Sequence, residues 1–343
     1  MSTATETTST IRSRTDSLVD AATSPATAPA SFPTLDEVRG RNALRAVVSR
    51  GIVGLSLCGP DGRWAGLDVD IARAVAAAVL GDAEAVEWVA SDPAERLDRL
   101  VAREAELTVC NLTWTLGREA GWPVLFAGVT CYDGEGFLVR GDSGIVDPAQ
   151  LAGARLAVQA GTTSAANLAA WYGRRGLEPV EPVAFATPAQ TLAAYASGEC
   201  VAYVLDRTAL AGERAALVDP WNHHVLDTSI SREPMGAAVR DDDPHWYRLC
   251  RWVLQLLTAA EHQVDEAGAG HRAEALAEAA RLAGPHGPAV GLDEQWAARV
   301  LAAVGTYADV YERNLGGASG LGVPRGLNEL WTRGGLHYAV PLH

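Results

Sequence analysis

Short apolar runs alternate with alanine-rich amphipathic stretches from Leu35 onward. This alternation is typical of βα units that feed a parallel sheet. The first units are expected as strands at 44–48, 86–89 and 107–109, with helices at 68–79 and 93–103. In the second of these helices Leu97, Leu100 and Val101 fall on one face, which suits a helix that packs on a sheet.

The same pattern starts again after Asp147. Its units are expected as strands at 155–159, 183–185 and 201–205, a helix that opens at Thr162 or Thr163, and a helix at 188–196. Two extended apolar stretches, 137–140 and 235–240, flank these units and are candidates for strands that cross between two lobes. The remaining chain predicts helices at 246–257, 274–282 and 294–311, which are expected to pack back on the first lobe.

The pattern therefore predicts an α/β protein of two lobes, the first built from 34–136 and 235–343 and the second from 137–234. Residues 1–33 are rich in Ser, Thr, Ala and Pro and contain no apolar run of the length that a secretory signal needs. We expect a disordered tail and a cytoplasmic protein. Export is the alternative if the true start of translation lies upstream.

Composition narrows the classes of function. The 343 residues include 48% hydrophobic residues, which is enough for two domain cores. The chain has 42 acidic and 28 basic residues, which give a net charge of −14, and it contains no block of basic residues. This charge excludes nucleic acid as a partner. No stretch is long and apolar enough to predict a membrane span.

Five widely spaced cysteines form no CxxC pair, so neither a disulfide framework nor a zinc site is indicated. The pair His223–His224 follows Pro220 and is interpreted as part of a surface loop rather than as metal ligands. The phosphate-cradling and metal-binding motifs GxGxxG, GxxxxGK[ST] and HExxH are absent. No cofactor is expected, and any chemistry must come from side chains alone.

Polar residues gather just beyond the strand at 107–109, where open α/β sheets place their ligands. The segment NLTWTLGR runs from Asn111 to Arg118 and includes Thr113 and Thr115. A guanidinium binds a carboxylate through two parallel hydrogen bonds, and nearby hydroxyls complete such a clamp. The alternative is that Thr115 caps a helix and Arg118 is a solvated residue of its first turn.

Two further strand ends carry candidate groups. Gly161, Thr162 and Thr163 follow a strand and open a helix, so their backbone N–H groups could bind an anion, and a plain strand-to-helix turn is the alternative. Asp206 closes the run VAYVLD and could accept an ammonium group, or it could cap the helix that follows. A carboxylate clamp and an ammonium acceptor together would form a site for an α-amino acid.

The order of these motifs along 34–343 resembles the general L-amino-acid solute-binding proteins of ABC transporters. The segments that carry the resemblance include NLTWTLGRE at 111–119, GVTCYDGEGFLV at 128–139, VQAGTT at 158–163, YVLDRTALAGER at 203–214, VPRGLNELW at 323–331 and WTRGGLHYAVP at 331–341. The resemblance implies a type II periplasmic-binding-protein fold, which is a two-lobed α/β clamshell with two hinge crossovers, here followed by a helical tail.

The resemblance also implies roles for individual residues. Thr113 and Arg118 would hold the α-carboxylate with help from Asn111, Thr163 would add a hydroxyl, and Asp206 would take the α-amino group. The ligand's side chain would lie against four residues on the loop after the first strand and near the second helix: Ser49, Ile52, Leu55 and Pro93.

At several positions the sequence differs from the family that it resembles. Ile52 and Leu55 stand where aromatic residues are expected, and Ala157 stands where close relatives place the disulfide partner of Cys200. Cys110 lies beside Arg118 and a predicted helix start, so we expect its thiolate to be favoured and consider it as a nucleophile or acid/base. Glu135 stands where relatives have glutamine and is the second catalytic candidate, with a solvated edge-strand residue as the alternative.

Two functions follow. The departures favour a cytoplasmic, cofactor-independent enzyme that acts as a lyase on an amino-acid-like substrate by elimination, dehydration or cyclisation, as cyclohexadienyl dehydratases do on a similar scaffold. The thiol and carboxyl of Cys110 and Glu135 would then do the chemistry in a closed cleft. The alternative is a binding protein that serves an ABC permease or senses amino acids inside the cell, in which hinge closure is the only event. The expected partner in both cases is a small amino acid or derivative.

Overall fold

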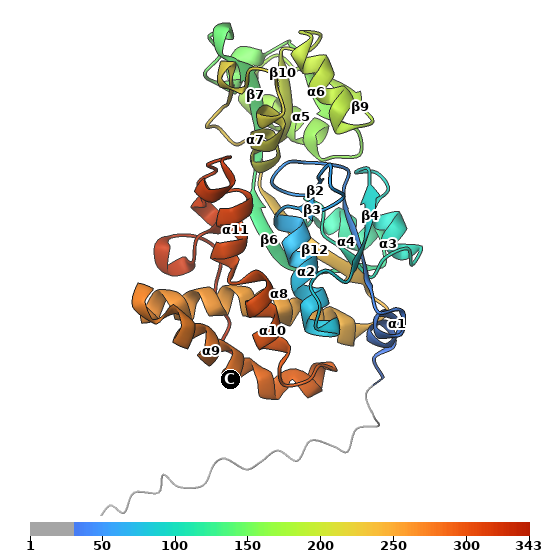
Figure 1. Ribbon diagram of the computed structural model, residues 1–343. Coiled ribbons are helices and arrows are strands. Elements are labelled where there is room, and N and C mark those ends of the chain that lie inside the picture. Colours follow the sequence, from blue (N-terminus) through green and yellow to red (C-terminus); the bar gives the residue numbers. More distant parts are fainter. Residues whose placement is uncertain (1–30) are drawn as a thin grey trace, which may run out of the picture. The chain divides into compact units, whose positions relative to one another are not determined.

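The computed structural model describes residues 31–343, and its strands form two five-stranded sheets and a two-stranded hairpin (Figure 1). The first sheet has the order β4-β1-β5-β12-β6, and the second has the order β11-β7-β10-β8-β9. The predicted tail over 1–33 falls almost entirely outside the described residues and stays a prediction. The helix α1, Pro33–Arg41, was not expected from the sequence. Its first residue is the last residue of the predicted tail.

The first sheet combines strands from both ends of the chain. Its strands are β1 (Leu44–Ser49), β4 (Val86–Ser91), β5 (Leu107–Thr108), β6 (Val124–Asp133) and β12 (Glu233–Arg240). The strands β1, β4 and β5 run parallel, whereas β12 is antiparallel to β5 and β6. Helices cover both faces of this sheet, so every residue of β1 except the half-buried Arg45 is buried, and the strand contains the unbroken apolar run 46–48. The long strand β6 was missed by the sequence analysis.

Helices and a hairpin complete this lobe. They are the hairpin β2 (Leu57–Cys58) and β3 (Trp64–Ala65), and the helices α2 (Leu67–Leu80), α3 (Arg96–Val101) and α4 (Leu116–Gly121). The start of α2 requires glycine, because a Cβ on Gly66 would lie 2.0 Å from the carbonyl oxygen of Leu55 and the φ of Gly66 is 138°. The alanines of α2 let it pack closely and leave almost no side chain of it exposed.

The second sheet carries the second set of βα units. Its strands are β7 (Glu135–Arg140), β8 (Arg155–Gln159), β9 (Glu181–Phe185), β10 (Ala202–Asp206) and β11 (His223–Val225), with helices α5 (Ser164–Arg175), α6 (Pro188–Ala196) and α7 (Arg207–Ala215). The surface loop predicted at His223–His224 is instead the strand β11, in which His224 is exposed and His223 is buried. The buried His223 ring has polar partners: its Nδ1 lies 2.5 Å from the hydroxyl of Tyr195, and its Nε2 lies 3.3 Å from Asp219.

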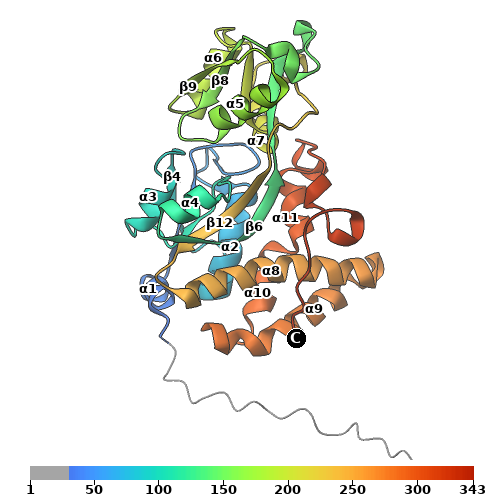
Figure 2. The same ribbon diagram turned by 180° about the vertical axis from the view of Figure 1, so that it is seen from behind.

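Two crossings join the sheets (Figure 2). Only Gly134 separates β6 from β7, and its N–H donates to the carboxylate of Asp133 at 2.7 Å. The second crossing leads into β12, whose first residue Glu233 pairs with Asp133. Because the two crossings lie side by side in one ladder, they can bend together as a hinge.

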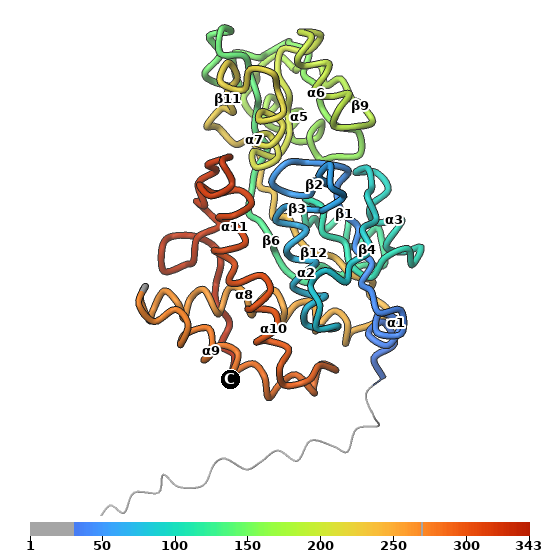
Figure 3. The backbone as a smooth tube through the Cα atoms, viewed as in Figure 1, coloured from blue at the N-terminus to red at the C-terminus, as the bar shows by residue number. Residues whose placement is uncertain are grey.

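The C-terminal helices pack on the first lobe (Figure 3), and their apolar side chains join those of α2 in one core cluster. They are α8 (Pro244–Ala267), α9 (Arg272–Ala283), α10 (Trp296–Val304) and α11 (Tyr307–Asn314). The single helix predicted over 294–311 is wrong, because Gly305 adopts a φ of 75° and Thr306 then caps α11. Among residues 31–343 no helix is long and apolar enough to cross a membrane.

Candidate ligand-binding site

A small cavity of about 20 Å³ lies where the carboxyl ends of strands from both sheets meet. Its lining residues are Pro93, Arg96, Asn111, Thr113 and Arg118 from the first lobe, and Gln159, Thr162, Thr163, Ser164, Leu205 and Asp206 from the second. The lobes touch beside it, since a Cβ on Gly161 would lie 2.9 Å from Ala94. The sequence motifs at 111–118, 161–163 and 206 are therefore brought together.

Arg118 points into this cavity from α4. Its Nη1 donates to the carbonyl of Thr113 at 2.6 Å, which fixes the guanidinium beside the cavity. Burial, followed by the nearby Arg96, lowers the pKa of Arg118. Arg118 is half-buried and so is not the freely solvated residue of the alternative. The helix cap predicted for Thr115 is confirmed, because its hydroxyl accepts from the N–H of Arg118 at 3.2 Å. Thr115 does not line the cavity.

Asp206 and Asn111 connect the two lobes. The Asn111 side-chain amide donates to Asp206 at 3.0 Å, and its carbonyl accepts from the Ser49 hydroxyl at 2.7 Å. Asp206 occupies the N-cap position of α7 but forms no side-chain cap bond. Its carboxyl is directed to the cavity instead. Burial, and then the charges of Asp133 and Glu233, raise the pKa of Asp206 well above its ordinary value. An ammonium group bound here would stabilise the charged form of Asp206 and lower its pKa.

The turn at 161–163 presents its threonines to the cavity. The Thr162 hydroxyl donates to the carbonyl of Gln159 at 2.7 Å, which closes the turn. Thr163 is the N-cap residue of α5, yet its hydroxyl makes no cap bond and lies 3.4 Å from a carboxylate oxygen of Glu233. Gly161 does not line the cavity. It lies at the contact with the other lobe, where its φ of 76° and the closeness of Ala94 favour glycine.

The side-chain pocket predicted on the loop after β1 is only partly correct. Ile52 and Leu55 are fully buried in the core cluster of the first lobe and do not line the cavity, because the loop turns them inward. Ser49 is also buried and lies one layer behind the cavity, where it holds Asn111 and Arg96. Pro93 lines the cavity as predicted.

Arg96 is a cavity residue that the sequence analysis missed. Its side chain is buried, and its Nη2 donates to the Ser49 hydroxyl at 2.8 Å. The residue lies four positions before Leu100 on α3, and therefore on the face that packs against the sheet. An arginine four residues before a leucine of the buried helix face was the sequence signal that could have identified it.

A pair of buried carboxyls lies at the hinge next to the cavity. The side-chain amide of Asn167 on α5 donates to Glu135 at 2.6 Å and to Glu233 at 2.7 Å, so it holds both crossings to the second lobe. The alternative of a solvated Glu135 is wrong, because only 2% of the residue is exposed. Burial raises the pKa of Glu135 to about 7. Glu233 and Asn167 were not predicted as site residues.

Glu135→Gln is expected to flatten the pH dependence of thermal stability. The folded Glu135 carboxyl binds its proton more tightly than it does in the unfolded chain, so stability is lost as the pH rises from the ordinary pKa of 4.5 to about 7. Glutamine stays neutral and removes this loss. Melting temperatures at about pH 5 and about pH 7.5 should differ less in the variant than in the wild type. The exposed Glu178→Gln is the control, and equal pH dependence in all three proteins would contradict the assignment.

The prediction of a favoured Cys110 thiolate is wrong. Cys110 is buried among apolar side chains such as Leu97, Leu112 and Phe126. Burial raises the pKa of its thiol to about 11, and the opposing influence of Arg96 is smaller. A thiol in this environment is a poor nucleophile near neutral pH. The electrostatic reason for considering Cys110 as catalytic is therefore lost.

One fast-reacting thiol per chain is expected in the native protein. Cys58 on β2 is exposed, while the other four cysteines are buried and unpaired. Titration with dithionitrobenzoate should show one rapid equivalent in the wild type and none in Cys58→Ser. Rapid reaction of a second thiol would contradict the burial of Cys110 and Cys131.

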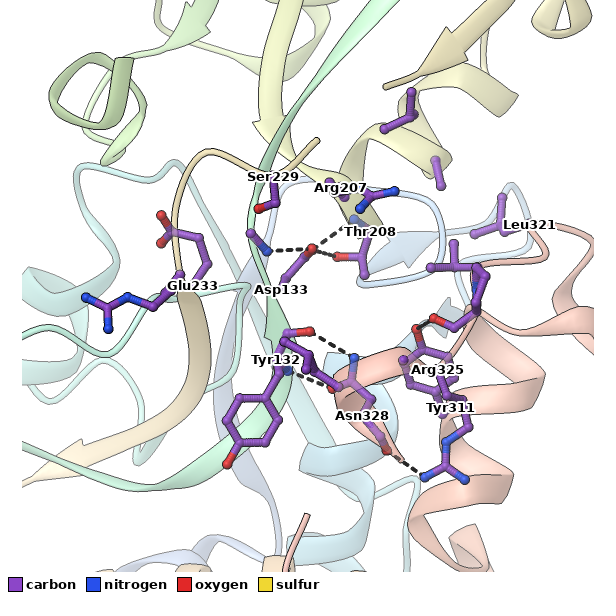
Figure 4. A pocket seen from close by; sticks show the side chains of 18 of the residues that line it. Tyr132, Asp133, Arg207, Thr208, Ser229, Glu233, Tyr311, Leu321, Arg325 and Asn328 are labelled. Carbon is purple, nitrogen blue, oxygen red and sulfur yellow. Dashed lines mark hydrogen bonds between the residues drawn. The ribbon is translucent and has the colours of Figure 1, made fainter. Parts of the chain in front are cut away.

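A larger cavity of about 800 Å³ lies on the far side of the crossings (Figure 4). There the Asp133 carboxylate accepts from the N–H of Thr208 at 2.8 Å and from its hydroxyl at 2.5 Å, so the hinge caps the first turn of α7. Its walls come from α7, the crossings and the 321–328 segment. Arg118 and Asp206, the residues predicted to bind the termini of an amino acid, face the small cavity, which is therefore the candidate site despite its size.

Two α/β lobes with paired crossings and a polar cleft between them define a substrate-binding protein of the two-lobed kind. The chain belongs to the bacterial extracellular solute-binding proteins, family 3, whose model matches residues 44–265. It is 35% identical over 319 residues to the "General L-amino acid-binding periplasmic protein AapJ" of Rhizobium johnstonii, covering 91% of this chain and 93% of that one.

Solved structures agree on the fold. A structure titled "ABC transporter / periplasmic binding protein from Brucella ovis with glutathione bound" superposes with a TM-score of 0.86 and 35% identity, covering 91% of this chain and all of that one. The ancestral amino-acid-binding protein described as a precursor of cyclohexadienyl dehydratase is 24% identical with a TM-score of 0.55, covering 71% of this chain and 98% of that one. This second likeness concerns the fold alone. The type II periplasmic-binding-protein fold expected from the sequence is confirmed.

Proposed function

We propose that the chain is the amino-acid-binding component of an ABC importer and binds its ligand by closing two lobes around it. The observation that carries the proposal is the placement of Arg118 and Asp206 in one cavity, each on a different lobe. A carboxylate on Arg118 and an ammonium group on Asp206 would join the lobes through the ligand. Such a bridge makes closure depend on ligand binding.

The lyase activity that the sequence departures favoured is not supported. The relatives that cover most of the chain are named as binding proteins, and the neighbour that hints at catalysis shares only the fold. Cys110 also lacks the lowered pKa that the enzymatic role required. The cytoplasmic location is likewise unsupported, because the relatives are named as periplasmic or transporter proteins. Export, the earlier alternative, becomes part of the proposal.

The test is a panel of single L-amino acids, each added to the purified protein while its thermal unfolding is followed. A ligand that binds the folded state raises the melting temperature, and the rise grows with the logarithm of the ligand concentration relative to its dissociation constant. Stabilisation by one or more amino acids, with none of them consumed, supports a binding protein. Conversion of a stabilising amino acid into a new compound would instead support an enzymatic function. The absence of any stabilisation would refute amino-acid binding.

A further inference from the structure

The large cavity beside the hinge has the size of a small-molecule site. Its volume of about 800 Å³ lies within the range of ~300–1,000 Å³ that small-molecule pockets span. Helix α7 of the second lobe forms one wall and the segment 321–328 of the first lobe forms the facing wall, as the positions of Arg207 and Leu321 in Figure 4 show. The cavity shares no lining residue with the small one around Arg118 and Asp206, so it is separate from the proposed amino-acid site.

The wall from the first lobe presents leucines on a fixed support. Leu327 and Leu336 are 53% and 51% exposed, and the N–H of Leu336 donates to the carbonyl of Leu327 at 2.9 Å. Beneath them the buried Arg325 donates to both carboxylate oxygens of Glu261 at 2.8 and 3.1 Å, and the Asn328 amide exchanges two hydrogen bonds with the backbone of β6. Large apolar side chains that are held together and stay exposed are typical of a binding surface.

The facing wall from the second lobe is basic. Arg207, Arg214 and Arg232 all line it, in a chain whose net charge is −14. The Nη2 of Arg207 lies 3.8 Å from the exposed carboxylate of Asp227. Over the described range 31–343, Arg214 and Arg232 form no ion pair with a carboxylate within 4.0 Å. Two guanidinium groups at this wall are therefore available to an anion.

The two acidic residues that line the cavity are held by other groups. The Asp133 carboxylate accepts from both the N–H and the hydroxyl of Thr208. The Glu233 carboxylate accepts from the Asn167 amide at 2.7 Å and from the Ser231 hydroxyl at 2.6 Å. Neither forms an ion pair with an arginine of the cavity, so the positive charge of the wall from the second lobe is not matched within the described chain.

We propose that this hinge cavity binds a small amphipathic anion, with its carboxylate or phosphate on Arg214 and Arg232 and its apolar body on Leu327 and Leu336. A guanidinium binds either anionic group through paired hydrogen bonds. An apolar chain would remove the exposed leucines from water. An inorganic anion or a neutral hydrocarbon satisfies only one of the two walls, which is why the ligand must combine both properties.

A ligand in this cavity contacts both lobes and is therefore expected to act on amino-acid binding. The cavity has its present shape while the lobes touch, at Gly161 against Ala94 and at Gly212 against Val53. An anion that fits this arrangement favours it, as an amino acid bound between the lobes does. Because the coupling between two ligands is reciprocal, each should raise the affinity of the other. This coupling rests on the proposed function, whereas the anion site does not.

The experiment is isothermal titration of the full chain with octanoate, and with acetate and octanol, which carry only the charge or only the chain. We expect octanoate to bind about tenfold or more tightly than either of them. Arg214→Gln and Leu327→Ser should each weaken octanoate binding about fivefold or more. Arg174→Gln and Val218→Ser, which change an exposed arginine and an exposed valine outside the cavity, are the matched controls and should bind as the wild type does.

Three results would overturn the anion site. They are octanoate binding no tighter than that of acetate or octanol, unchanged octanoate affinity in both Arg214→Gln and Leu327→Ser, and loss of octanoate binding in Arg118→Ala, which would place the anion in the small cavity.

The coupling is measured by titrating the best-bound L-amino acid with and without saturating octanoate. Octanoate should raise the affinity of the wild type about threefold or more and leave that of Arg214→Gln unchanged. An equal amino-acid affinity with and without octanoate overturns the coupling alone. Failure of every amino acid to bind refutes the proposed function and the coupling with it, whereas the anion site is still judged by octanoate binding.

Discussion

Arg118→Ala is expected to weaken amino-acid binding by about 100-fold or more and so to abolish ligand-induced thermal stabilisation. The guanidinium is fixed by the carbonyl of Thr113 and lines the cavity, so its loss leaves the α-carboxylate of the ligand buried without a partner. Titration calorimetry and melting curves measure both effects. Arg63→Ala removes an arginine that is 87% exposed and should change neither. Wild-type affinity in Arg118→Ala would contradict the cleft assignment.

Asp206→Asn tests the other anchor without changing its size. The uncharged amide cannot balance an ammonium group, so binding should again be lost. The ligand-free variant should melt at a higher temperature than the wild type, because burial and the neighbouring Asp133 and Glu233 make the charged form of Asp206 unfavourable. A residue that serves ligand binding but lowers the stability of the ligand-free protein is typical of a binding site. Loss of binding together with a lower melting temperature would point to misfolding instead.

Gly212→Ala is also expected to weaken binding, although Gly212 does not line the cavity. Gly212 lies on α7 in the second lobe, and a Cβ there would approach the Val53 carbonyl oxygen of the first lobe to 2.3 Å. The methyl group should therefore hold the lobes apart and weaken binding about tenfold or more, since closure and binding are coupled. Alanine in a helix is favoured over glycine by about 1 kcal/mol, which offsets part of the cost of the shift that this backbone contact forces.

Gly173→Ala is the matched control for this experiment. Gly173 also lies in a helix of the second lobe, α5, but a Cβ there meets nothing within 4 Å. It should gain the same helical preference and keep the wild-type affinity. If Gly212→Ala binds as tightly as Gly173→Ala, the contact between α7 and Val53 is not part of the ligand-bound state.

The sequence predicted the anchors because they occur in short segments at strand ends. Asn111, Thr113 and Arg118 lie beyond a strand end of the first lobe, and Thr163 and Asp206 lie at strand ends of the second. Two crossings between the lobes were expected to place these strand ends face to face, and the resemblance implied the role of each residue. Which alternative each residue adopts depends on tertiary contacts. Thr115 does cap its helix, whereas Asp206, in the cap position of α7, turns its carboxyl to Asn111 instead.

The rest of the site could not be predicted, because burial is decided by segments far apart in the chain. Glu135 and Glu233 lie on two strands that are far apart in the sequence, and both are buried where Asn167 of α5 donates to them. The pKa of Cys110 depends on the apolar residues around it more than on its neighbours in sequence, and Ile52 turns into the core although it follows a strand end. Arg96 had a signal in its helical spacing, but one arginine on a short helix is ambiguous.

The central claim is that the cavity holds an amino acid through Arg118 and Asp206 and releases it unchanged. Equilibrium binding of an isotopically labelled amino-acid mixture, followed by denaturation and mass spectrometry of the released compound, tests it most directly. We predict one amino acid per wild-type chain, recovered with its original mass, and none on Arg118→Ala or Asp206→Asn. Recovery of an altered compound, or equal recovery from the two variants, would contradict the account.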